Sequence, residues 1–139
     1  LGENLASVTI DMAWGLLPAG TKITDVDAFE REALTKSGLP FTLVPPRYRS
    51  TYFSHVFAGG YSAAYYAYIW SEVMDADAIA WFTTDGAIDG DLGLNRKAGD
   101  TFRREFLARG DSRDASTSYR AFTGRDPSIL PLLKRRGLT

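Results

Sequence analysis

Hydrophobic positions recur at helical spacing along most of the chain, and no long strand-like alternation stands out. The first such stretch predicts a helix over residues 3–17, with an apolar stripe formed by Leu5, Val8, Met12 and Leu16. Five more helices are predicted over residues 25–36, 61–82, 96–108, 112–122 and 129–136. Thr24 or Asp25 can cap the second helix, and Asp111 or Ser112 the fifth. The pattern predicts one mainly α domain of about six helices.

One stretch interrupts this helical pattern. Residues 39–53 contain the pair Pro45-Pro46, which forbids a helix and favours an extended path. Arg and Tyr side chains follow in quick succession, at Arg47, Tyr48, Arg49 and Tyr52. Such a segment can line a cleft or form a well-packed loop, and the sequence leaves both interpretations open.

The next stretch, residues 54–70, holds the sole histidine, a Gly-Gly pair and four of the seven tyrosines. Gly59 and Gly60 favour a flexible, non-helical turn that carries His55. From Tyr61 onward Ala is frequent and Gly is absent until Gly86, which predicts a long helix. On that helix Tyr61, Tyr65 and Tyr68 would share one face, at positions i, i+4 and i+7.

These tyrosines have two interpretations. One is an aromatic stripe packed in a core. The other is a binding site, because each buried phenol needs a hydrogen-bond partner and a packing stripe would more often use Leu or Phe. A tyrosine hydroxyl and a histidine N–H are also donors suited to a carbonyl oxygen that gains negative charge. Such donors assist a reaction and need a metal or a base from elsewhere.

Composition excludes several classes of function. The chain of 139 residues has no cysteine and one histidine, so an ordinary zinc site cannot be assembled from it alone. No apolar run approaches the roughly 20 residues that span a bilayer. Residues 85–95 resemble a calcium loop at first, but Ala87 and Arg96 stand where ligands belong. A Gly/Asp-rich turn is expected there instead.

Charge is divided unevenly along the chain. Residues 1–95 carry 5 basic and 12 acidic side chains, whereas residues 96–139 carry 11 basic and 5 acidic ones. The basic part, including Lys134, Arg135 and Arg136, either binds nucleic acid or pairs with acidic groups elsewhere. Pairing is the expectation, because acidic residues lie among the basic ones and the basic cluster is short.

Four segments resemble the M3 family of zinc metallopeptidases, which includes thimet oligopeptidase and the peptidyl-dipeptidases. The segments are FSHVFAGGYSAAYYAYIWSEVMDADAIAWF, LASVTIDMAW, PPRYRSTYFSHVF and FRREFLARGDSRDASTSYRAFTGRDPSILPLLKRRGL. The resemblance spans essentially the whole chain, and its most specific part is H-x-x-A-G-G-Y followed by Y-Y-x-Y. The spacing from His55 to Tyr61 is closer to the bacterial peptidyl-dipeptidase branch, since the thimet-like branch has one residue fewer there.

The resemblance implies roles for particular residues. Tyr68 would donate a hydrogen bond to the oxyanion of the tetrahedral intermediate, and His55 would contact substrate and assist at the same oxygen. Tyr61 would bind the substrate backbone, with Tyr65 as a weaker substrate-binding candidate that packing would also explain. The pair Gly59-Gly60 would be the hinge that lets the loop close on a peptide.

The resemblance also implies what this sequence lacks. Family members bind zinc through HExxH and a downstream glutamate, and the Glu of HExxH is the general base. The chain contains no HExxH and starts with Leu1, so we expect it to be the C-terminal part of a longer enzyme. The expected partners are short peptides and the rest of that polypeptide. Binding to nucleic acid or to a membrane is not expected, and the expected location is the cytoplasm.

Two further expectations follow. The isolated segment should be inactive, and its self-association would be unsurprising because an apolar face would be uncovered. The alternative is a stand-alone helical module that binds peptides without cleaving them.

Overall fold

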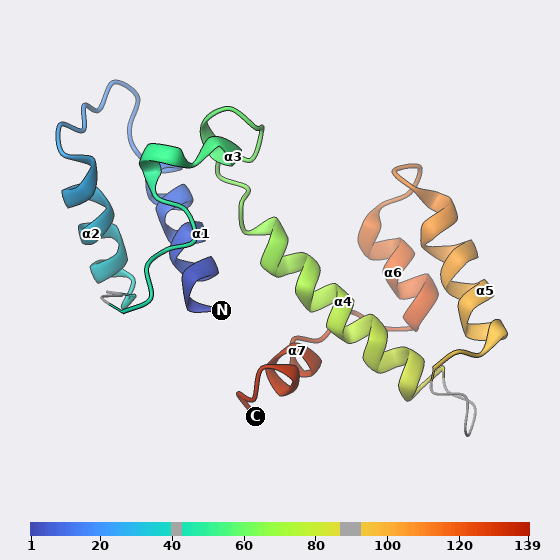
Figure 1. Cartoon of the computed structure of the whole chain (residues 1–139). Coiled ribbons are helices and arrows are strands. Elements are labelled where there is room, and N and C mark those ends of the chain that lie inside the picture. The colour runs from blue at the N-terminus through green and yellow to red at the C-terminus, as the bar shows by residue number, and fades with distance from the viewer. Residues whose placement is uncertain (40–42, 87–92) are drawn as a thin grey trace. The chain divides into compact units, whose positions relative to one another are not determined.

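The chain folds as a mainly α protein (Figure 1). The computed structural model describes residues 1–39, 43–86 and 93–139. Within these ranges it contains seven α-helices, two 3₁₀ turns and no strand. The helices are α1 (Gly2–Gly15), α2 (Val26–Lys36), α3 (Ser54–Phe57), α4 (Ala67–Thr83), α5 (Arg96–Glu105), α6 (Ala115–Thr123) and α7 (Leu130–Arg135). The 3₁₀ turns are η1 (Ser50–Tyr52) and η2 (Leu107–Arg109). The prediction of a mainly α fold is therefore confirmed.

None of the described helices is both long and apolar enough to cross a membrane. The helices form two compact units, Leu1–Ile69 and Trp70–Thr139. The Gly/Asp-rich turn predicted over residues 85–95 lies largely outside the described residues.

In the N-terminal unit, α1 packs beside α2 (Figure 1). The core of this unit joins both helices to the segment around α3 and consists of Ala6, Ile10, Leu34, Phe53, Val56 and Tyr65. The predicted stripe on α1 is wrong at Leu16, which follows the helix and is 75% exposed, whereas Val8 packs against the core and Leu5 and Met12 are only partly buried. The fully buried face instead comprises Ala6, Ser7, Ile10 and Asp11. Two of these four are polar, so a rule based on apolar spacing selects a neighbouring face.

The helix caps explain where two helices begin. The Asp25 carboxylate accepts a hydrogen bond from the Ala28 N–H at 2.8 Å, which confirms one of the two predicted caps of α2. The prediction for α6 is wrong, because Asp114 accepts from the Thr117 N–H at 2.8 Å and is the actual cap. Asp111 and Ser112 lie in the preceding turn, where the Ser112 N–H donates to the Arg109 carbonyl.

Buried side chains of α1 and α2 hold the irregular stretch that precedes His55. The Ser7 hydroxyl accepts from the Tyr48 N–H at 2.9 Å, and the Trp14 indole N–H donates to the Ser50 hydroxyl at 2.7 Å. Glu30, which is 2% exposed, accepts from both the Ser50 N–H and the Arg49 guanidinium. This stretch is therefore anchored along its backbone as well as by its aromatic rings.

The long helix α4 begins at Ala67, so the predicted start at Tyr61 is wrong. Residues 61–66 form a series of turns instead, in which Ala63 adopts a positive φ of 54°. Left-handed backbone at a non-glycine residue interrupts a right-handed helix. The local composition predicts a helix, but the turn finds its hydrogen-bond acceptors on α1, as described below.

In the C-terminal unit, aromatic side chains form most of the core. Trp81, Ala98 and Phe122 are buried together, with Phe82, Phe102 and Phe106 packed against them. A smaller cluster of Val73, Ala76 and Leu132 joins α4 to α7. The sequence of α4 is apolar on several sides, which predicts burial on several sides. Trp70 and Ile79, however, are 58% and 57% exposed, so that prediction is wrong for this chain.

A fully buried carboxylate, Asp77, links α4 to α6 and to the loop that follows α6. Its Oδ2 accepts from the Tyr119 hydroxyl at 2.6 Å and from the Arg125 guanidinium at 2.7 Å. Burial opposes ionisation of Asp77, but the hydrogen bonds from Arg125 and Tyr119 outweigh it and lower the pKa of this carboxyl. Burial and the Asp77 carboxylate together raise the pKa of Tyr119. A charged partner thus makes the buried carboxylate tolerable.

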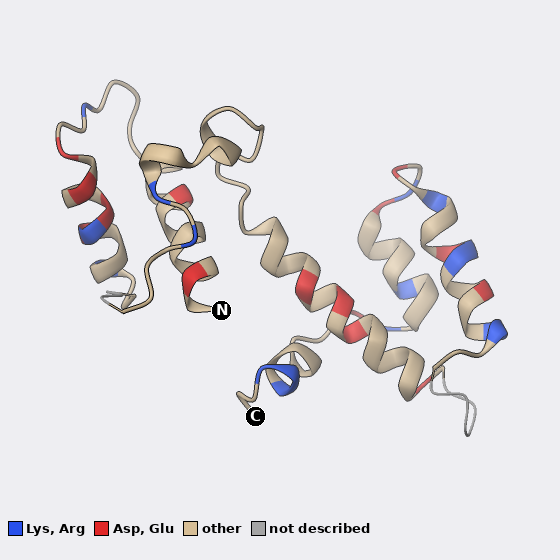
Figure 2. Cartoon of the chain, viewed as in Figure 1, with Lys and Arg blue, Asp and Glu red and all other residues tan. Residues whose placement is uncertain are grey.

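Two arginines at the C-terminal end of α7 pair with acidic residues of α4 (Figure 2). Arg135 contacts Asp75 and Arg136 contacts Glu72, both at 2.7 Å. The expectation that the basic part of the chain pairs with acidic groups is confirmed for these residues. Exposed ion pairs of this kind contribute little stability, about 0–1 kcal/mol each.

Two glycines provide a matched test of the backbone. A Cβ at either Gly99 or Gly124 would meet nothing within 4 Å, but Gly124 has a φ of +79° at the end of α6 while Gly99 lies inside α5. We predict that Gly99→Ala raises the free energy of unfolding by about 0.5–1 kcal/mol. Gly124→Ala should lower it by about 1 kcal/mol. Urea denaturation of the two variants measures both changes, and equal effects would contradict the backbone explanation.

Candidate functional site

A tight turn brings the backbone of Tyr61 back to His55. His55 lies in the short helix α3, not in a non-helical loop as predicted, and the Tyr61 N–H donates to the His55 carbonyl at 3.0 Å. Gly60 has a φ of +80°, and a Cβ at Gly59 would lie 3.0 Å from the same carbonyl oxygen. Both glycines are therefore required by local geometry, one by its conformation and the other by a close approach.

Aromatic rings surround the imidazole of His55. The ring centroids of Tyr48, Tyr65, Tyr61 and Tyr68 lie 4.8, 5.6, 6.0 and 6.2 Å from that of His55. Nδ1 of His55 is buried and has no hydrogen-bond partner among the described residues. Packing against rings, and not a polar partner at Nδ1, therefore fixes the orientation of this side chain.

The structure brings Tyr61, Tyr65 and Tyr68 together, although not on one helical face as predicted. The rings of Tyr61 and Tyr68 stack with centroids 5.4 Å apart, and the Tyr65 ring lies 5.0 Å from that of Tyr68. Tyr68 is in the first turn of α4, whereas the other two are in the preceding turn region. Turn geometry thus produces the cluster that the sequence predicts from helical periodicity.

The side chain of Tyr68 is exposed, and its pKa is raised. Tyr68 is 45% exposed, and the neighbouring Tyr61 hydroxyl, more than desolvation, raises the pKa of Tyr68 above its ordinary value. A phenol is protonated at neutral pH even at its ordinary pKa of about 10, so the Tyr68 hydroxyl can donate to an anionic oxygen.

Tyr65 differs from its neighbours. It is only 4% exposed and belongs to the core of the N-terminal unit. Burial is the main cause that raises the pKa of Tyr65. Its ring packs against those of Tyr68 and Phe53, with centroids 5.0 and 4.9 Å away. This position favours a packing role for Tyr65.

An open pocket of about 340 Å³ adjoins the cluster and is lined by Ser54, His55, Ala58, Gly59 and Tyr61. The sole histidine, one glycine of the pair and an exposed tyrosine thus face the same space. A volume of this size falls in the range of small-ligand sites. Two of the predicted substrate-binding side chains, His55 and Tyr61, line it.

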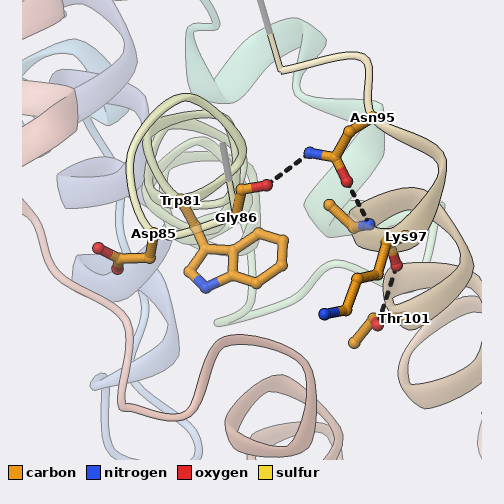
Figure 3. A pocket seen from close by; sticks show the side chains of 7 residues that line it. Trp81, Asp85, Gly86, Asn95, Lys97 and Thr101 are labelled. Atoms are coloured by element: carbon orange, nitrogen blue, oxygen red, sulfur yellow. Dashed lines mark hydrogen bonds between the residues drawn. The ribbon is translucent and has the colours of Figure 1, made fainter. Parts of the chain in front are cut away.

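A second pocket, of about 280 Å³, lies in the C-terminal unit (Figure 3). Its polar groups mostly serve the helix start: the Asn95 side chain accepts from the Ala98 N–H at 2.7 Å and donates to the Gly86 carbonyl. The Thr101 hydroxyl donates to the Lys97 carbonyl at 3.1 Å. These interactions cap and line α5, so the side chains of Asn95 and Thr101 already have structural partners.

The residues required for a zinc site do not come together here. Within residues 1–39, 43–86 and 93–139, no group of three or more His, Cys, Asp or Glu side chains is placed to hold a metal ion. The donor set of the described residues therefore does not fit the zinc that the family resemblance implies.

Sequence reasoning missed one residue of this region and only partly recognised another. Asp11 on α1 accepts from the N–H groups of Ala63 and Tyr65, 52 and 54 residues away. The ring of Tyr48 stacks on that of Phe53 at 5.1 Å and is tilted against His55. An ionisable residue inside the apolar run of TIDMAW is the available signal for Asp11. Tyr48 lies in the stretch for which the sequence allows either a cleft lining or a packed loop.

Comparison with known proteins identifies the family of this chain. Residues 18–138 match peptidase family M3, and the chain belongs to this family. It is 41% identical to a dipeptidyl carboxypeptidase of Escherichia coli strain K12 over 99% of its length and 43% identical to one of Salmonella typhimurium strain LT2 over 98%. An organellar oligopeptidase A of Arabidopsis thaliana is 38% identical over 97%.

The chain is much shorter than these relatives. It spans 19% of the length of each bacterial dipeptidyl carboxypeptidase and 16% of the plant oligopeptidase.

The contact between Tyr61 and Tyr68 yields a prediction about ionisation. Tyr61→Phe removes the neighbouring hydroxyl that raises the pKa of Tyr68, so this pKa should fall toward the ordinary value of about 10. The measurement is a pH titration followed by NMR of a ¹³C-labelled tyrosine at position 68. Tyr66→Phe is the control, because Tyr66 is 52% exposed and is expected to leave the titration unchanged. An unchanged pKa in Tyr61→Phe would refute this account.

Proposed function

We propose that this chain forms part of the active site of a zinc-dependent M3 peptidase that hydrolyses short peptides. Its contribution would be to bind the peptide and to stabilise the oxyanion that forms at the scissile carbonyl. The names of the bacterial relatives support release of C-terminal dipeptides as the reaction, and the plant relative supports the broader class of oligopeptide hydrolysis.

The observation that carries this proposal is the position of Tyr68. Its side chain is 45% exposed and lies beside both His55 and Tyr61, which line an open pocket. Hydrogen-bond donors aimed at a developing negative charge lower the barrier to peptide hydrolysis, because they interact more strongly with the transition state than with the substrate. In this proposal the Tyr68 hydroxyl donates to the oxyanion.

The family resemblance also suggests roles for the neighbouring residues, and their positions are compatible with these roles. A ring N–H of His55 contacts the substrate and assists at the same oxygen, and Tyr61 binds the peptide backbone from the wall of the pocket. The Gly59-Gly60 turn lets the backbone close on the peptide. Substrate contact by Tyr65 stays a weaker prediction, because this side chain is buried.

The rest of the active site would lie outside this sequence. Since the described residues do not form a metal site, the zinc would be bound by other residues of a longer polypeptide, in the cytoplasm. The 139-residue chain alone is then expected to be inactive. The exposed Trp70 and Ile79 support the further expectation that it self-associates in isolation, which light scattering over a concentration series would test.

Replacing Tyr68 tests the proposed function. In the full-length, zinc-loaded peptidase, Tyr68→Phe should lower kcat by about 10²–10³-fold, because one oxyanion donor is lost. KM should change much less, since the oxyanion forms in the transition state and is absent from the bound substrate. Steady-state hydrolysis of a short peptide provides both constants, and the zinc content of the variant should equal that of the wild type.

Tyr66→Phe is the matched control for this substitution. Tyr66 is two positions from Tyr68 and is 52% exposed, and its substitution also removes one phenol hydroxyl. Its ring, however, is not among those that contact His55. It should retain wild-type turnover. Undiminished kcat in Tyr68→Phe would return the tyrosines to a packing role, and peptide binding without any hydrolysis by the full-length protein would favour a binding module.

A further inference from the structure

The turn of residues 61–66 has few hydrogen bonds of its own. The Ala64 N–H donates to the Tyr61 carbonyl at 2.9 Å, and the Ala67 N–H donates to the Ala64 carbonyl at 3.0 Å. Within this turn Ala63 has a φ of 54°, a left-handed conformation that is energetically unfavourable for alanine. Something outside the turn must therefore hold it in place.

Asp11 on α1 supplies the missing acceptors. Its Oδ1 accepts from the Ala63 N–H at 2.8 Å, and its Oδ2 accepts from the Tyr65 N–H at 2.9 Å. The side chain is 1% exposed. Hydrogen bonds from N–H groups to an ionised carboxylate are stronger than those to a neutral acceptor. One buried side chain thus binds both N–H groups that flank residue 64.

Asp11 is unlike the other buried carboxylates of the molecule. Glu30 pairs with Arg49 and Asp77 pairs with Arg125, whereas Asp11 has no ion-pair partner in the part of the chain that the structure describes. Its described partners are the two backbone N–H groups of the turn. A buried carboxylate without a cation is costly unless such hydrogen bonds compensate. Its geometry therefore serves the turn.

One helical turn further along α1, Gly15 also meets this segment. A Cβ at Gly15 would lie 3.0 Å from the Cβ of Ala63. Asp11 and Gly15 are four residues apart, so they face the same side of α1. Asp11 binds the backbone N–H of Ala63, and the absence of a side chain at Gly15 leaves room for the Ala63 side chain.

We propose that Asp11 is the positioning residue of the tyrosine cluster, an inference that rests on the proposed function of Tyr68. The turn connects Tyr61 to Tyr68, so the two hydrogen bonds to Asp11 fix where both phenols stand relative to His55. Asp11 itself is buried against the turn and would not contact the substrate. It would act through the placement of the Tyr68 hydroxyl.

A double-mutant cycle in the full-length, zinc-loaded peptidase tests this inference. Asp11→Asn replaces one acceptor oxygen with an NH₂ group, which cannot accept from a backbone N–H. We expect kcat to fall about 10-fold or more when Tyr68 is present. In the Tyr68→Phe background the same change should lower kcat by less than about 3-fold, because residues that act through one another are not additive.

Asp77→Asn is the matched control for a general loss of structure. Asp77 is also fully buried and also accepts two hydrogen bonds, but from Tyr119 and Arg125 in the C-terminal unit. Its effect on kcat should be the same in both backgrounds. If Asp11→Asn behaves additively in the same way, or leaves kcat unchanged, Asp11 is not a positioning residue.

A second readout does not depend on turnover. In metal-free Asp11→Asn protein, the pKa of a ¹³C-labelled tyrosine at position 68 should fall, because the Tyr61 side chain no longer stays beside it. An unchanged titration would overturn the inference.

A substitute variant covers the case in which Asp11→Asn is unfolded, and the Tyr68→Phe result separates the two proposals. If Asp11→Asn does not fold, Gly15→Ala takes its place in the cycle, because it crowds Ala63 while the carboxylate of Asp11 stays. A non-additive loss of kcat then supports the positioning role, and an additive loss refutes it. If Tyr68→Phe alone leaves kcat unchanged, the proposed function fails. If only the Asp11 cycle is additive, the proposed function stands and the positioning role fails.

Discussion

The hydrogen bonds between buried side chains of α1 and α2 and the backbone of residues 48–65 determine the architecture of the N-terminal unit. A backbone N–H that is buried outside a helix must find another acceptor. Ser7, Asp11 and Glu30 provide these acceptors for the N–H groups of Tyr48, Ala63, Tyr65 and Ser50. Two ordinary helices can thereby hold a long non-helical segment in one conformation.

This arrangement explains how one histidine comes to be surrounded by aromatic rings. The segment meets α1 twice, once before α3 and once after the glycine turn, and each passage is fixed by a polar side chain of that helix. Tyr48 arrives on the first passage and Tyr61 on the second. The rings then pack on the His55 imidazole, whose Nδ1 has no polar partner among the described residues.

Local sequence signals predict the helices well, because Gly, Pro and capping residues act over a few positions. Asp25 and the ends of α1 and α2 are examples. These signals fail at Tyr61, where Ala-rich composition favours helix but Asp11, 52 residues away from Ala63, captures its N–H. The sequence still predicts that the site residues lie close together, because His55 and the tyrosines are near one another along the chain. No pattern of spacing predicts the long-range acceptor.

The different burial of the tyrosines indicates how such a cluster can serve catalysis. A donor to an oxyanion must be reachable by substrate and must also be held still, so that little reorganisation is needed during the reaction. Tyr65, at 4% exposed, provides rigidity, while Tyr68, at 45% exposed, provides access. The ring of Tyr61 stacks on that of Tyr68 and helps to hold it in place. Rigidity and access are thus supplied by different residues, and the backbone turn held by Asp11 connects them.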